Sequence, residues 1–171
     1  MDNAPGGPPA GNSTSISGFL ERVVAARGYR GQIVHVEEIA SRDPAFVAPR
    51  TPLSEPILAA LRSLGISSLY AHQAAAIDRV AEGKNVAIVT STASGKTICY
   101  NIPVLEALLA DKDSTALYLF PTKALAQDQL RGLGSLCGSD PSLAGLIHAG
   151  TYDGDTPGET RRKLRNEAKV L

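Results

Sequence analysis

The amino-acid sequence predicts an α/β fold: a parallel, doubly wound sheet with helices on both of its faces. Two observations carry this prediction. Short apolar runs that suit buried strands alternate with longer segments that suit helices, and glycines and prolines separate them. The chain has 171 residues, which is enough for one such domain and little more.

The first fifty residues differ in character from the rest. Residues 1–14 are rich in proline, glycine and serine, so we expect a flexible tail. Residues 15–52 form an expected N-terminal extension, with one helix and then a short strand at 31–36. The helix is indicated by apolar residues at the spacing of one buried helical face, namely Ile16, Phe19, Leu20, Val23 and Val24.

Two helices are expected before the first long strand. Ser54, Glu55 and Pro56 are typical of a helix start, with a capping hydroxyl, an acid in the first turn and a proline where no amide is needed. This helix is expected to end at about Leu64. The second covers 71–82, since a glycine follows it.

From residue 85 the order strand, loop, helix recurs. Residues 86–89 are an almost unbroken apolar run, as expected of a parallel strand covered on both faces. Strands are expected over 86–89, 115–120 and 146–149, with another beginning at 170, and helices over 96–110, 122–136 and 158–169. In such sheets, ligands bind beyond the carboxyl ends of the strands.

Composition excludes several classes of protein. Lys and Arg number 17 and Asp and Glu number 17, so any basic surface for nucleic acid must be local. The apolar runs are too short to span a bilayer and no secretory signal is present, so no membrane partner is expected. The two cysteines, Cys99 and Cys137, lack metal-ligand spacing, and a reducing cytoplasmic location is expected.

The most informative segment is the loop between the strand at 86–89 and the helix at 96–110. It reads Thr90, Ser91, Thr92, Ala93, Ser94, Gly95, Lys96 and Thr97. In a loop of this kind, backbone N–H groups and a helix N-terminus surround phosphate oxygens. Lys96 would reach the β- and γ-phosphates and Thr97 would ligate Mg²⁺, so these two are the expected catalytic residues and ATP with Mg²⁺ the expected cofactors. An ordinary Ser/Thr/Gly loop before a helix is the alternative.

Several further motifs accompany this loop. They are residues 31–36, 69–73, 91–97, 99–105, 120–129 and 152–156. With them the chain resembles the superfamily 2 DEAD/DEAH-box helicases, in particular the branch of DNA-repair helicases typified by mitomycin repair factor A. The resemblance implies an ATP-dependent DNA helicase whose first RecA-like ATP-binding domain is residues 53–171. Its partner would be single-stranded or partly duplex DNA, with RNA not excluded.

The resemblance also assigns nucleotide-binding roles outside the loop. Gln73 matches the glutamine that reads adenine in the family. Its amide offers a donor and an acceptor, which fit the N7/N6 edge of the base. Tyr70 would pack on the base. The alternatives are an exposed helical glutamine and a partly buried tyrosine.

Two segments match loops that contact the nucleic-acid backbone in the family. The implied contact residues are Pro121, Thr122, Lys123, Gln127, Thr151, Asp153, Gly154, Asp155 and Thr156. Contacts of this kind position a strand but carry no sequence information. A capped helix N-terminus at Thr122 and an ordinary Asp/Gly turn at 151–156 are the alternatives. A basic cluster at 161–165 is interpreted as a solvated helix face.

The Asp-Glu-Ala-His motif that holds Mg²⁺ in this family does not occur in the 171 residues, and neither does a second motor domain. We therefore expect an N-terminal piece of a helicase that is inactive alone. The alternative functions are a non-enzymatic nucleotide- or nucleic-acid-binding module and a small P-loop kinase.

Overall fold

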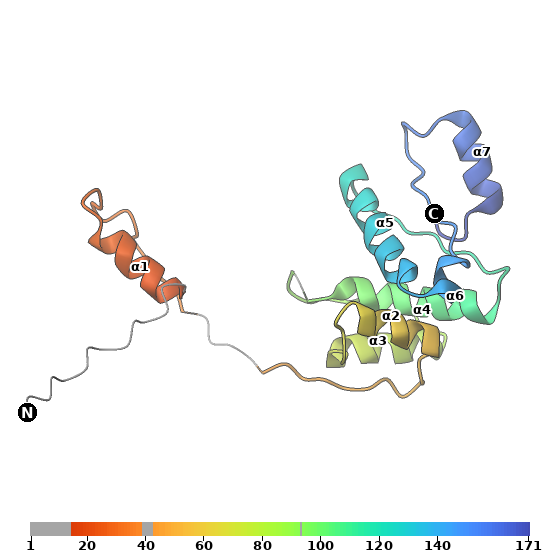
Figure 1. The fold of residues 1–171 in the computed structure, drawn as a ribbon, viewed down its shortest axis with the longest axis horizontal. Coiled ribbons are helices and arrows are strands. Elements are labelled where there is room, and N and C mark those ends of the chain that lie inside the picture. The colour runs from red at the N-terminus through yellow and green to blue at the C-terminus, as the bar shows by residue number, and fades with distance from the viewer. Residues whose placement is uncertain (1–14, 39–42, 93) are drawn as a thin grey trace, which may run out of the picture. The chain divides into compact units, whose positions relative to one another are not determined.

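The structure is a computed structural model that describes residues 15–38, 43–92 and 94–171. The chain divides into two compact units, Met1–Arg42 and Asp43–Leu171 (Figure 1). The expected tail at 1–14 and Ala93 of the loop 90–97 lie outside the described residues.

The first unit contains the expected helix, α1, over Ile16–Ala25. Ser15 caps it, because its Oγ accepts a hydrogen bond from the Gly18 N–H at 3.1 Å. Within this unit the apolar face of α1 is not covered: no residue of α1 is buried, and Ile16 is 79% exposed. Residues 31–36 make no β-bridge with any described residue, so the expected strand is not formed. The described part of this unit supplies no second layer for either element.

The second unit holds the remaining described helices (Figure 1). They are α2 (Glu55–Ser63), α3 (Ala71–Ala81), α4 (Lys96–Ala110), α5 (Lys123–Gly138), α6 (Pro141–Ala144) and α7 (Gly158–Glu167). Apart from α6, each lies within two residues of its predicted bounds. The short helix α6 was not predicted; Asp140 starts it by accepting the Ser142 N–H at 2.9 Å.

Parallel pairing joins three segments of this unit. Val170 bridges in parallel to both Ala116 and Ala149, so the 170 segment lies between the other two. The backbone bonds agree: Ala116 N–H donates to the Lys169 carbonyl at 2.8 Å and Gly150 N–H to that of Val170 at 3.1 Å. These segments, expected as strands of a parallel sheet, therefore pair in parallel at isolated bridges.

The predicted strand at 86–89 forms no bridge among the described residues, and the Val89 side chain is 95% exposed. A parallel strand gains its hydrogen bonds only from neighbours on its edges. The described residues place no strand beside this run, so this unit has fewer paired strands than the sequence predicts.

The core of the second unit lies among α2, α4, α5 and α6. Its most deeply buried side chains are Ile57, Ile102, Leu105, Leu108, Leu133 and Leu143. Glu106 on α4 links this core to the start of α2, because its carboxylate accepts the Ser54 N–H at 2.7 Å and the Ser54 hydroxyl at 2.5 Å. The expected role of Ser54 as a capping hydroxyl is thus wrong: its side chain makes no bond to α2, since it donates to Glu106.

The segment before α2 is fixed by Asp78 of α3. The Asp78 carboxylate accepts the backbone N–H groups of Arg50 at 2.9 Å and Thr51 at 3.2 Å, and it pairs with the Arg50 guanidinium at 3.2 Å. Burial raises the pKa of this carboxyl, but the hydrogen bonds from Thr51 and Arg50 outweigh burial and hold it below its ordinary value.

None of the helices in the described ranges combines the length and the apolar character that a bilayer span requires.

Candidate functional site

The loop that precedes α4 depends on a glycine. Gly95 is the N-cap residue of α4 and has φ of +74°, the left-handed region that disfavours other residues. A Cβ on Gly95 would lie 2.4 Å from Nε2 of Gln73. Both the backbone conformation and the close approach of Gln73 therefore require glycine here.

Lys96 folds back over this loop. Its Nζ donates to the carbonyl oxygens of Thr90 at 3.1 Å and Ser91 at 2.5 Å, and it lies 3.4 Å from the hydroxyls of Thr90 and Ser94. These two hydroxyls share a hydrogen bond of 2.6 Å that closes the loop. Lys96 has no ion-pair partner among the residues that the structure describes. Its charge is thus held at the loop with neutral partners only, which an anion can replace.

Two side chains at the start of α3 contact carbonyl groups of the loop 90–97. Gln73 is 3% exposed; its Oε1 accepts the Tyr70 N–H at 2.9 Å and its Nε2 donates to the Gly95 carbonyl at 3.0 Å. His72 Nε2 lies 2.9 Å from the Ser94 carbonyl oxygen. Because a carbonyl only accepts, Nε2 carries the hydrogen in this contact. The loop is therefore positioned by side chains that lie about twenty residues earlier.

The exposed-glutamine interpretation of Gln73 is wrong, since the side chain is buried. Its role as a reader of adenine stays a prediction. In the structure, Gln73 spends one N–H and one oxygen lone pair on Tyr70 and Gly95, so one donor and one acceptor position of the amide are left.

Tyr70 lies in a stack of rings. Its ring centroid is 5.1 Å from that of Phe46 and 5.8 Å from that of His72, with nearly parallel planes. Phe46 and Tyr70 also form an antiparallel β-bridge. Contact of Tyr70 with a base stays a prediction.

Thr97, the expected ligand of Mg²⁺, lies one residue into the first turn of α4. Its hydroxyl donates to Gln129 Oε1 at 3.2 Å, and the Tyr100 hydroxyl donates to the same oxygen at 2.6 Å. The described residues contain no cluster of His, Cys, Asp and Glu that could hold a metal alone. One hydroxyl beside a phosphate loop does fit Mg²⁺ that arrives with the phosphates, because this ion keeps few protein ligands.

The predicted nucleic-acid residues fall into two groups. Pro121, Thr122 and Lys123, just before and at the start of α5, line a cavity of about 470 Å³ together with Thr151 and Asp153. The remaining predicted contacts, which are Gln127, Gly154, Asp155 and Thr156, do not line it. Thr122 also caps α5, since its Oγ1 accepts the Leu125 N–H at 3.3 Å, so that alternative is confirmed while its phosphate contact stays a prediction.

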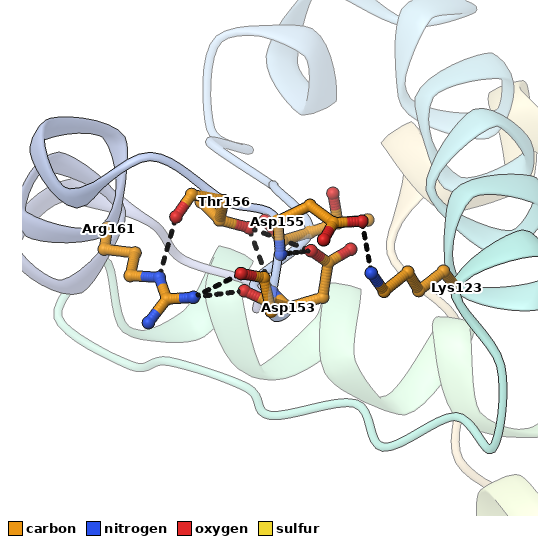
Figure 2. Close-up of polar contacts among 7 residues, drawn as sticks. Lys123, Asp153, Asp155, Thr156 and Arg161 are labelled. Atoms are coloured by element: carbon orange, nitrogen blue, oxygen red, sulfur yellow. Dashed lines mark hydrogen bonds and ion pairs between the residues drawn. The ribbon is translucent and has the colours of Figure 1, made fainter.

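The loop 151–156 is fixed by its own side chains and by Lys123. Asp155 N–H donates to the Asp153 carboxylate at 2.8 Å, and Asp153 N–H donates to Thr156 Oγ1 at 2.9 Å. Lys123 forms an ion pair with Asp155, which joins the start of α5 to this loop (Figure 2). The hydrogen bond and the opposite charge lower the pKa of Asp155 and raise the pKa of Lys123.

A family model describes most of this unit. Residues 70–171 match the model of the DEAD/DEAH box helicases, which is more than half of the chain. The chain belongs to the DEAD/DEAH box helicase family. The P-loop NTPase fold of this family is therefore the fold of the second unit.

Individual relatives agree with this assignment. The chain is 40% identical over 162 residues to the ATP-dependent helicase hrq1 of Schizosaccharomyces pombe. This match covers 92% of the chain and 15% of that relative. The crystal structure of the DUF1998 helicase MrfA bound to DNA matches with 38% identity and a TM-score of 0.78, covering 93% of the chain and 20% of MrfA. The structure of MrfA bound to DNA and AMPPNP matches with 42% identity and a TM-score of 0.72 over 77% of the chain and 18% of MrfA. The predicted branch of the family is thus confirmed, and the chain spans a fifth or less of these relatives.

The sequence patterns did not point to His72 or Arg161 as parts of either site, and on α5 they favoured Gln127 over Gln129. His72 precedes Gln73 at a helix start, and this position could have indicated that His72 lies close to the loop 90–97. Arg161 lies on a helix face that looks ordinary in sequence. Only the folded chain shows the partners of Gln129 and Arg161.

Proposed function

We propose that this chain provides the nucleotide-binding part of an ATP-dependent DNA helicase that acts in DNA repair. The observation that carries the proposal is the loop at the N-terminus of α4, where Gln73 donates to the Gly95 carbonyl and Lys96 donates to the carbonyl of Thr90. Family membership and the names of the relatives support the same activity. We further propose that the segments at 116–118, 148–150 and 169–171 belong to one parallel sheet.

ATP would bind with its phosphates at residues 90–97. The first-turn amides of α4 and the ammonium of Lys96 would hold the phosphate oxygens, with Lys96 exchanging the carbonyls of Thr90 and Ser91 for the phosphate. Thr97 would hold Mg²⁺, which neutralises phosphate charge and orients the oxygens. Gln73 and Tyr70 would face the base.

Single-stranded or partly duplex DNA would pass the starts of α5 and of the loop 151–156. Thr122 and Lys123 would contact phosphates from α5, and the backbone of Thr151, Gly154 and Thr156 would contact them from the loop, with Asp153 and Asp155 shaping it. This contact would be independent of sequence and would weaken as salt concentration rises.

Turnover needs a carboxylate that holds Mg²⁺ and a group that orients water. The 171 residues contain no Asp-Glu-Ala-His motif, so we propose that this chain alone binds Mg-ATP without efficient hydrolysis. A cytoplasmic location also belongs to the proposal, and the two free, buried cysteines support a reducing compartment.

Thermal melting of the 171-residue chain tests the proposal. Mg-ATP and, separately, single-stranded DNA should each raise the Tm, because ligands that bind only the folded state stabilise it. An unchanged Tm at saturating Mg-ATP, or robust phosphate release from ATP by the purified chain, would contradict the account.

A further inference from the structure

Arg161 on α7 reaches back to the loop 151–156. Its Nε donates to the Thr156 carbonyl at 2.8 Å, and its Nη2 donates to those of Asp153 at 2.7 Å and Gly154 at 3.1 Å. The guanidinium also lies over the Tyr152 ring, 5.2 Å from its centroid. Figure 2 shows Arg161 approaching the loop from α7 and Lys123 approaching from α5.

These bonds fix the direction of the peptide planes. In a trans peptide, the carbonyl and the N–H of the next residue point in opposite directions. No cis peptide occurs among the described residues. Because the carbonyls of Asp153 and Gly154 point at Arg161, the N–H groups of Gly154 and Asp155 point away from it. The Asp155 N–H donates to the Asp153 carboxylate, so of these two amides that of Gly154 is left for a phosphate oxygen. Arg161 thereby sets which way these loop amides face.

We infer that Arg161 is a positioning residue for nucleic-acid binding. It holds the loop 151–156 so that the side of the loop facing away from Arg161 meets the sugar-phosphate backbone. Arg161 does not contact that backbone. The inference rests on the proposed function. It separates Arg161 from its exposed neighbours Arg162 and Lys163, which remain a solvated helix face. A planar guanidinium suits this role, since it donates several hydrogen bonds in fixed directions.

The first test measures the loop without DNA. Amide hydrogen exchange is recorded on the full 171-residue chain and on Arg161→Ala, Arg161→Lys and the control Arg162→Ala. The inference predicts exchange about fivefold or more faster at 152–156 in both Arg161 variants, with wild-type rates in the control. Arg161→Lys keeps the charge, so it also serves if the alanine variant folds poorly.

The second test measures binding of a fluorescein-labelled single-stranded oligonucleotide at several salt concentrations. Arg161→Ala and Arg161→Lys should each raise Kd roughly five- to tenfold and leave the dependence of log Kd on log salt unchanged. A direct phosphate contact would instead reduce that slope by about 0.7 in the alanine variant and would be rescued by lysine.

The outcomes separate the inference from the proposed function. Wild-type exchange rates in both Arg161 variants, or a reduced salt slope with rescue by lysine, would overturn the inference. If the wild-type chain binds no DNA, the proposed nucleic-acid function fails, and with it the binding role of Arg161. Faster exchange would then still support Arg161 as the residue that holds this loop.

Discussion

Gln73 Nε2 donates to the Gly95 carbonyl at 3.0 Å, and this bond joins the start of α3 to the start of α4. The buried amide and the left-handed glycine fit each other so closely that a Cβ on Gly95 would meet the amide nitrogen. The shape of the phosphate loop therefore depends on a residue twenty-two positions earlier.

Gly95→Ala should destabilise the chain and weaken Mg-ATP binding. The left-handed backbone costs a non-glycine residue about 1–2 kcal/mol, and the contact with Gln73 adds to this. Gly65→Ala is a matched control, because Gly65 has φ of +75° with open space around its Cβ position. The free energy of unfolding, measured in urea, should fall further for Gly95→Ala. An equal decrease in the free energy of unfolding in both variants would mean that the contact with Gln73 adds nothing to the cost.

Gln73→Ala should lower the free energy of unfolding by about 1–3 kcal/mol, because the Tyr70 N–H and the Gly95 carbonyl lose their partner. Nucleotide affinity should fall for ADP and for a triphosphate alike, since the whole loop loosens. Asn166→Ala, an exposed amide on α7, is the control. Wild-type stability and affinity in Gln73→Ala would show that the bond to Gly95 does not shape the loop.

Asp155→Asn should strengthen binding of single-stranded DNA. It removes a negative charge beside the proposed path and frees Lys123 for phosphate, so Kd should fall about two- to fivefold at low salt. Asp128→Asn is the control. It changes the net charge equally and breaks the ion pair between Asp128 and Arg131, which lie on α5 as Lys123 does. An equal gain in both variants would mean that only net charge matters.

The Asp78 anchor predicts a dependence of stability on pH. The pKa of Asp78 is lowered in the folded chain, so its contribution is fully present above the unfolded-state pKa of about 3.9. It is lost as pH falls below that value and through the folded pKa. The difference in Tm between the wild type and Asp78→Asn should therefore be largest near neutral pH and shrink below about pH 4. A difference that stays constant from pH 7 to pH 2 would contradict this.

Local signals explain what the sequence predicted well. The bounds of α2, α3 and α4 follow from glycines, a proline and apolar spacing within each segment. The loop 90–97 was recognisable because its chemistry is contained in eight consecutive residues. Such features need no knowledge of distant contacts.

Features that depend on distant partners were beyond the sequence. Ser54 looked like a capping residue, but its hydroxyl donates to the carboxylate of Glu106, which lies far along the chain. Residues 86–89 read as a buried strand, although pairing needs neighbouring strands at its edges and burial needs helices on its faces. Arg161 was indistinguishable from the solvated arginine beside it, because its role comes from the carbonyls it reaches.

We propose that the loop before α4 binds a nucleotide through Lys96. Titration calorimetry with Mg-ATP tests it on the 171-residue chain, with Lys96→Ala and the exposed Lys163→Ala as the paired variants. The account predicts saturable binding by the wild type and by Lys163→Ala, and loss of measurable binding in Lys96→Ala. Equal affinity in Lys96→Ala and the wild type would contradict it.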